Sequence, residues 1–399
     1  MCVTPPVRRE RLIEVAAVFT RLGCTSFGGP IAHLGYFRDE FVARRRWLDE
    51  QAYADLVALC QFLPGPASSQ VGIALGTLRA GLIGGLVAWL GFTLPSALLM
   101  IAAAYGVRFL DGDADWLHGL KVVAVAVVAQ AVWGMVRTLC PDRQRASVAL
   151  VAAIVLLAFP GAIIQVAVIV VGGIIGWRFL QDAPLPPARA FAVPFSRGFA
   201  VTCWVLFFGL LVALPLMRQA MPGDGLALFD SFYRAGALVF GGGHVVLPLL
   251  HAEVVPPGRV SDAQFIAGYG MAQAVPGPLF TFAAYLGAAQ APAPDGWQGG
   301  LLALLAIFLP AWLLVIGALP FWDRLRARAG AQAALRGMNA AVVGILLAAL
   351  YAPIATTAIV RPLDFALALG CFGMLVLWKW PPWIVVVVAG VAGAALSVL

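Results

Sequence analysis

Long apolar stretches separated by short polar loops run along almost the whole chain. Residues 84–107, 122–136 and 383–399 contain almost no charged side chain. An α-helix needs about 20 apolar residues to cross the roughly 30 Å of hydrocarbon in a bilayer, and these stretches are close to that length. The pattern therefore predicts an all-α integral membrane protein.

The apolar pattern occurs twice, and each copy is interpreted as seven helical pieces. In the first copy they lie near residues 12–35, 51–63, 66–80, 83–107, 119–139, 147–160 and 162–180. In the second copy they lie near residues 226–250, 262–275, 278–291, 299–321, 335–356, 363–378 and 382–398. A proline-rich stretch and one unpaired apolar helix, 199–217, separate the copies. We therefore expect a first repeat over residues 1–182, a linker with one extra transmembrane helix over 183–225, and a second repeat over 226–399.

Specific landmarks of the first copy return in the second in the same order. Phe27-Gly28-Gly29 returns as Phe240-Gly241-Gly242, and Leu63-Pro64-Gly65-Pro66 returns as Val275-Pro276-Gly277-Pro278. Arg21, Glu40, Gln61, Leu94-Pro95 and Leu117-His118-Gly119 correspond to Arg234, Glu253, Gln273, Leu309-Pro310 and Leu335-Arg336-Gly337. So many ordered matches indicate an internal duplication.

The positive charges lie at different places in the two copies. The loop after the first piece holds Arg38 and the run 44–46, whereas its counterpart in the second copy holds only Arg259. The loop after the fourth piece is acidic in the first copy and basic in the second. Because cytoplasmic loops collect Lys and Arg, the two copies are expected to insert upside down relative to one another.

The same rule predicts how often the chain crosses. If the N-terminal arginines, the 38–46 loop and Arg79 all stay in the cytoplasm, the first three pieces of each copy dip into the membrane and return. This gives nine crossings, four re-entrant elements and an external C-terminus. The alternative, that the dipping pieces cross fully and give more spans, stays open.

Gly-Gly-Pro and Pro-Gly-Pro sequences break helices inside apolar segments. Such breaks free backbone groups that lipid cannot satisfy, so they persist where protein or a watery cavity covers them. Free N–H groups at a broken helix end can hold an anion. Four symmetric breaks are expected to converge on a substrate site, although each could instead be a packing kink. The candidate residues at the breaks are Ser26, Gly28, Gly29, Gly241, Gly242, Gln61, Pro64, Gly65, Pro66, Gln273, Pro276, Gly277 and Pro278.

Charged residues inside the repeats add further candidates. Arg21 and Arg234 each lie six residues before a Phe-Gly-Gly, and a guanidinium fork suits a tetrahedral oxyanion. They can instead snorkel to the interfaces or pair with acids such as Glu14 and Asp230.

Acidic and neutral polar residues extend this set of candidates. Glu40 and Glu253, or Asp55, can carry a coupling proton, although carboxylates more often pair with loop arginines such as Arg44. The neutral donors near the breaks, which can complete oxyanion coordination or bond between helices, are Gln61, Gln273, Ser68, Ser69, Gln70 and Thr281.

Composition narrows the classes of function. Of 399 residues 62% are hydrophobic and only 11% charged, against about 25% charged in soluble domains. The net charge of +7 fits basic cytoplasmic loops rather than nucleic-acid binding. The scattered cysteines and histidines form no CxxC or ligand set, so we expect no disulfide framework, metal or cofactor. No GxSxG or HExxH motif supports a membrane-embedded enzyme.

These motifs together resemble the chromate ion transporter family in its long, two-domain form. In the first copy the resemblance rests on Thr25-Ser26-Phe27-Gly28-Gly29-Pro30-Ile31-Ala32-His33, on Trp47-Leu48-Asp49 and on Gln61-Phe62-Leu63-Pro64-Gly65-Pro66. In the second it rests on Phe240-Gly241-Gly242-Gly243-His244, on Val246-Leu247-Pro248-Leu249 and on Gln273-Ala274-Val275-Pro276-Gly277-Pro278. The second copy departs from the first at Gly243, which stands where the first has Pro30.

The resemblance implies export of chromate across the bacterial inner membrane, which confers resistance, with sulfate as a competitor. We expect alternating access driven by the membrane potential or by proton antiport. A sulfate carrier, another oxyanion carrier, an anion channel and a membrane-embedded enzyme are the alternatives. The oligomeric state, including a homodimer, stays open.

Overall fold

The computed structural model describes residues 8–109, 115–181, 191, 193–240, 243–322 and 328–396. Within these ranges every regular element is a helix, and no strand occurs. The candidate residues Gly241 and Gly242 lie outside the described residues.

The helices of the first repeat follow the predicted pieces closely. They are α1 (Arg8–Thr25), α2 (Gly29–Arg38) with the π-helical η1 (Asp39–Arg44), α3 (Glu50–Phe62), α4 (Ala67–Phe109), α5 (Asp115–Leu139), α6 (Arg143–Ala158) and α7 (Ala162–Phe179). The expected break falls between α1 and α2, at Gly28 and Gly29, both of which have positive φ angles. Helix α4 contains the expected boundary near residue 80, because Ala80 and Gly81 have non-helical backbone angles.

The linker helix α8 (Arg197–Ala220) precedes the second repeat. The second repeat comprises α9 (Asp224–Ala237), η2 (Gly243–Val245), α10 (Val246–Val254), α11 (Asp262–Ala274), η3 (Leu279–Thr281), α12 (Phe282–Ala289), α13 (Gly296–Ala318), η4 (Leu319–Phe321), α15 (Ala329–Ala349), η5 (Leu350–Ala355), α16 (Thr356–Ala358), α17 (Pro362–Val376) and α18 (Pro382–Leu396).

Polar side chains start several helices at the predicted places. Asp49, Asp142, Ser196 and Ser261 each accept a hydrogen bond from a backbone N–H in the first turn of the helix that follows. Such caps satisfy donors that a helix start leaves free.

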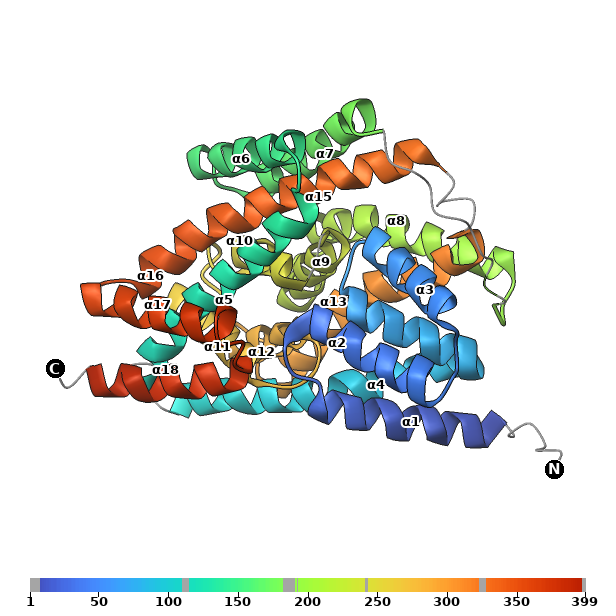
Figure 1. Ribbon diagram of the computed structural model, residues 1–399, viewed down its shortest axis with the longest axis horizontal. Coiled ribbons are helices and arrows are strands. Elements are labelled where there is room, and N and C mark those ends of the chain that lie inside the picture. The colour runs from blue at the N-terminus through green and yellow to red at the C-terminus, as the bar shows by residue number, and fades with distance from the viewer. Residues whose placement is uncertain are drawn as a thin grey trace.

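The two repeats are interlocked through their later helices. Helix α15 of the second repeat packs against α6 and α7 of the first, and α5 of the first packs against α17 and α18 of the second. Figure 1 shows α15 alongside α6 and α7 on one side of the molecule, with α5, α17 and α18 together on the other. Each repeat therefore contributes one helix that packs against two helices of the other repeat, as a two-fold relation between the repeats requires.

Matched close contacts repeat this relation residue by residue. A Cβ added at Gly119 would overlap the carbonyl oxygen of Ala389, and one added at Gly337 would overlap that of Gly172. Gly119 and Gly337 are corresponding positions in the repeated sequence. Small residues at both places let the helix backbones approach closely, which is typical of membrane helix packing.

The helices fit a multi-pass membrane protein. Among the described residues five helical stretches are long and apolar enough to cross a bilayer: Ala67–Val107, His118–Leu139, Arg197–Ala220, Gly296–Phe321 and Ala329–Ala358. The helices α6, α7, α17 and α18 are apolar but have only 15 to 18 residues. The number of full crossings and the inverted orientation stay predictions.

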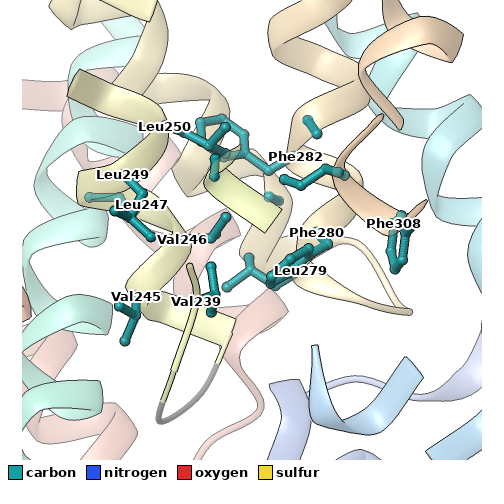
Figure 2. Close-up of a cluster of buried hydrophobic side chains, with 14 of the residues drawn as sticks. Val239, Val245, Val246, Leu247, Leu249, Leu250, Leu279, Phe280, Phe282 and Phe308 are labelled. Carbon is teal, nitrogen blue, oxygen red and sulfur yellow. The ribbon is translucent and has the colours of Figure 1, made fainter. Parts of the chain in front are cut away.

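Apolar side chains are exposed at the edge of the helix bundle and buried in its interior. Large side chains on α8, such as Val205 and Val212, are mostly exposed, which fits a helix at the edge of the bundle. The interior of the second repeat is instead a dense apolar cluster (Figure 2) that includes Val239, Val246 and Phe280, all at most 1% exposed.

Candidate functional site

The four helix breaks of the two repeats meet through reciprocal backbone hydrogen bonds. The N–H of Gly65 donates to the carbonyl of Val239 at 2.7 Å, and the N–H of Gly277 donates to the carbonyl of Ser26 at 2.9 Å. Each Pro-Gly-Pro break therefore bonds to the residue before the Phe-Gly-Gly break of the other repeat. The convergence of all four breaks on a substrate site stays a prediction.

Both central glycines are required by their surroundings. Gly65 and Gly277 have φ angles of 124° and 102°, which a side chain rarely adopts. A Cβ at Gly277 would lie 2.8 Å from the Ser96 hydroxyl, and one at Gly65 would lie 3.2 Å from the Ala311 methyl group. Ser96 and Ala311 follow the corresponding prolines 95 and 310, so this contact is also symmetric.

A histidine is buried beside the first break. His33 is fully buried, with its Nε2 3.2 Å from the Ser26 carbonyl and its Nδ1 3.3 Å from the Ser68 hydroxyl. Because a carbonyl can only accept, Nε2 carries the proton and Nδ1 accepts from Ser68. The ring of His33 also packs edge-on against Phe92.

The second repeat contributes His244 to the same region. Its Nδ1 lies 2.7 Å from the Tyr269 hydroxyl, and its Nε2 lies 3.9 Å from the point where a Gly29 Cβ would stand. A polar side chain of one repeat thus reaches the glycine break of the other.

The other predicted polar candidates are placed differently. Gln61 is exposed, whereas Gln273 is half-buried with its Nε2 bonded to no described group. The Ser69 hydroxyl is buried without a partner among described residues, but its counterpart Thr281 donates to the Pro278 carbonyl at 2.9 Å. Gln70 donates to the Pro64 carbonyl, which braces the first Pro-Gly-Pro break.

The candidate arginines and glutamates pair with each other, at matching places in the two repeats. Arg21 lies 2.6 Å from Glu40, and Arg234 lies 2.9 Å from Glu253. Arg234 also pairs with Asp230, one of the acids expected as its alternative partner. Glu14, the acid expected for Arg21, pairs instead with Arg45 and Arg79.

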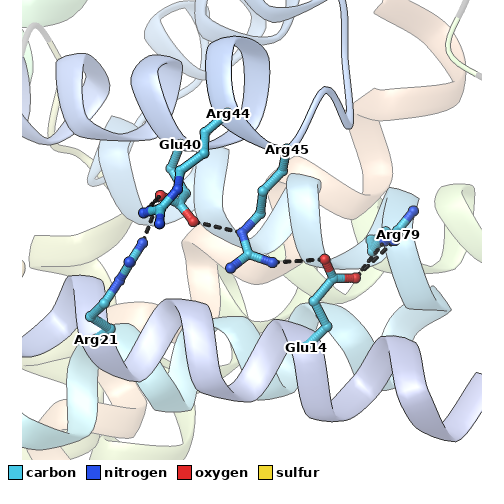
Figure 3. A network of polar contacts seen from close by, with 6 residues as sticks. All are labelled: Glu14, Arg21, Glu40, Arg44, Arg45 and Arg79. Carbon is cyan, nitrogen blue, oxygen red and sulfur yellow. Dashed lines mark hydrogen bonds and ion pairs between the residues drawn. The ribbon is translucent and has the colours of Figure 1, made fainter.

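Figure 3 shows that these pairs continue into a chain of charges in the first repeat. The Glu40 carboxylate, 7% exposed, also accepts from Arg45 at 2.6 Å and from Arg44 at 3.5 Å. Burial by itself raises the pKa of Glu40, but hydrogen bonds from Arg45 and Arg21 hold this pKa below its ordinary value. Glu40 is therefore ionised in this geometry, and its predicted role in proton coupling stays a prediction.

Comparison with known proteins gives the family. The family model described as Chromate transporter matches residues 13–177 and 226–394, on either side of α8. The chain belongs to the chromate transporter family. The two matched segments together cover most of the sequence.

Several members of the chromate transporter family resemble the chain along most of its length. The Chromate transport protein of Pseudomonas aeruginosa is 29% identical over 98% of this chain and 93% of its own. The Chromate transport protein of Cupriavidus metallidurans is 27% identical over 84% of this chain and 80% of its own. The Probable chromate transport protein of Synechococcus elongatus is also 27% identical, over 84% of this chain and 82% of its own. No solved structure matches the chain.

Sequence reasoning about this chromate transporter family member missed Ser96 and the partners of His33. Ser96 directly follows Pro95, a landmark that was matched between the repeats, and that adjacency was the available signal. His33 appeared only as part of a motif, because its contacts with Ser26 and Ser68 depend on the return of the chain at the first break.

Proposed function

We propose that this chain is a secondary transporter that exports chromate, a tetrahedral dianion, from the cytoplasm across the bacterial inner membrane and so confers resistance. The observation that carries the proposal is the pair of reciprocal bonds, Gly65 to Val239 and Gly277 to Ser26, which bring the broken helices of both repeats together. Broken helices that meet inside a membrane protein commonly form the substrate site of a transporter. The relatives named as chromate transport proteins supply the substrate class.

Inverted repeats and alternating access are part of the proposal. The opposite charge bias of the two repeats supports an inverted insertion, and the reciprocal packing of α5 and α15 supports a two-fold relation. Substrate would reach the breaks from one side at a time as the surrounding helices change position.

The double negative charge of chromate supports export as the direction of transport. Moving one elementary charge across about 100 mV is worth about 2.3 kcal/mol, so a dianion leaving a negative interior gains about 4.6 kcal/mol. That free energy sustains a concentration gradient of roughly a thousandfold. Export therefore needs no coupling ion. Proton antiport through Glu40, Glu253 or Asp55 is the alternative, and Glu40 would first have to leave Arg21 and Arg45 to take up a proton.

The proposed role of the two arginines is transient contact with the oxyanion. Arg21 is 45% exposed although it is paired with Glu40, so one side of its guanidinium stays accessible. Thr25 and Gly28 are also exposed and follow Arg21 at nearly helical spacing, which leads from the arginine to the first break. Arg234 occupies the matching place in the second repeat.

Radiolabelled chromate flux into inverted membrane vesicles tests this function. Uptake is expected to follow the imposed electrical gradient, to saturate with chromate concentration, and to be inhibited by sulfate. Collapsing the electrical and proton gradients separately identifies the driving force. Flux that does not saturate would indicate an anion channel, and absence of chromate flux in vesicles that contain the protein would refute the proposal.

A further inference from the structure

The two halves of the central region differ in polarity, although their backbones are matched. Around the first break the side chains include Ser26, His33, Ser68 and Ser96, each at most 2% exposed. Their counterparts in the second repeat are Val239, Val246, Phe280 and Ala311. Figure 2 shows Val239, Val246 and Phe280 within a cluster of apolar side chains. At these four pairs of positions the first repeat is therefore polar and the second apolar.

The polar half fixes one residue, Ser26, from two directions. Its carbonyl accepts from the Gly277 N–H at 2.9 Å and from the His33 Nε2–H at 3.2 Å. His33 is in turn held by Ser68 at its other nitrogen. In the second repeat the carbonyl of Val239 accepts from Gly65, but the position of the histidine is a valine that cannot donate.

The hydroxyl of Ser26 makes no hydrogen bond to the described part of the chain. Ser26 is 1% exposed, and its Oγ has no hydrogen-bond partner among the described residues. A buried polar group without a partner destabilises a protein, so its presence in a native structure calls for an explanation such as a bound water or ion. Ser26 lies three residues before Gly29, the first residue of α2, and a Cβ added at Gly29 would stand 3.9 Å from the His244 Nε2.

From these observations we propose that the polar contacts at the helix breaks are one-sided: the Ser26 hydroxyl is a direct ligand of the transported oxyanion, His33 and Ser68 position it, and the four apolar counterparts in the second repeat are structural supports. This inference rests on the proposed transport of chromate. It assigns the polar contacts to the first break, whereas the sequence pattern alone predicts equal use of both. His33 and Ser68 act through Ser26 and are positioning residues.

Purified full-length protein in proteoliposomes tests the inference with a matched pair of variants. For Ser26→Ala we expect the KM for chromate to rise about tenfold, because a hydrogen bond to a charged group is lost. The melting temperature is expected to stay unchanged, because Oγ has no hydrogen-bond partner among the residues that the structure describes. For Val246→Ala, at the counterpart of His33, we expect the reverse: a lower melting temperature, from lost apolar packing, and an unchanged KM.

The thermal shift on adding chromate gives a second readout. A ligand that binds the folded state raises the melting temperature, so the wild type is expected to show a shift that Ser26→Ala loses at the same chromate concentration. Ser68→Ala is expected to raise the KM less than Ser26→Ala, because it only loosens the positioning of His33.

The outcomes separate this inference from the proposed function. A wild-type KM in Ser26→Ala, a lowered melting temperature in that variant, or an equal KM increase in Val246→Ala would overturn the one-sided site while leaving chromate transport in place. Wild-type proteoliposomes that take up no chromate would overturn the proposed function and, with it, this inference.

Discussion

Replacing Gly277 by valine is expected to abolish transport. The residue has a φ angle of 102°, and its Cβ would lie 2.8 Å from the Ser96 hydroxyl and 3.2 Å from the Phe92 carbonyl oxygen. Two further methyl groups would push the second break away from Ser26, whose carbonyl the Gly277 N–H holds. Backbone strain and overpacking together are expected to cost about 3 kcal/mol. Chromate flux per amount of protein in vesicles measures the loss.

Gly106 provides the control for this substitution. It lies in α4, with no atom of the described part of the chain within 4 Å of the place where its Cβ would stand. Gly106→Val is expected to keep normal flux, because valine is tolerated in a helix at least as well as glycine. If Gly277→Val transported as well as Gly106→Val, the meeting of the breaks would have no part in transport.

Arg21→Ala is expected to abolish chromate resistance while the protein stays in the membrane, and Arg234→Ala is expected to do the same. The fold is retained because Glu40 keeps Arg45 at 2.6 Å as a partner, and Asp230 keeps Arg218 at 3.4 Å. What is lost is the guanidinium that can exchange its carboxylate for an oxyanion. Growth on chromate and immunoblots of membranes measure the two effects.

A double variant separates substrate contact from charge balance. If Arg21 only neutralises Glu40, then Arg21→Ala combined with Glu40→Gln restores resistance; if it contacts substrate, the double variant stays sensitive, as we expect. Arg38→Ala is the matched control, because its 2.6 Å pair with Glu50 is exposed on both sides and adds little to stability. Normal resistance in Arg21→Ala would remove the arginines from the proposed site.

The helices and their breaks could be predicted from sequence because their causes are local. Apolar runs set the helix positions, and glycine and proline set the breaks, so that α3, α5 and α7 begin and end within a few residues of the expected places. The π-helical segment Asp39–Arg44 was not predicted, because a single turn at a helix end is too short to change the apolar pattern. The helix kink at Ala352, the residue before Pro353, was not predicted either.

The contacts between repeats could not be predicted in the same way. That Gly65 bonds to Val239 and α15 packs on α7 depends on how the two halves exchange helices, which no local pattern encodes. The pairing of Arg21 with Glu40 joined two candidates that the sequence assigned to separate roles. The difference in polarity between the two repeats was visible in the sequence, because His33 corresponds to Val246. It was missed because an alignment of the repeats is based on the residues that they share.

The exchange of helices also bears on how the protein can move. If one repeat rocked as a unit against the other, the backbone contacts of Gly119 with Ala389 and of Gly337 with Gly172 would have to separate. A motion that preserves them carries α5 with α17 and α18, and α15 with α6 and α7. The mechanical units of this transporter would then be two hybrids, each assembled from both ancestral halves, and the boundary of the gene duplication would not be the hinge.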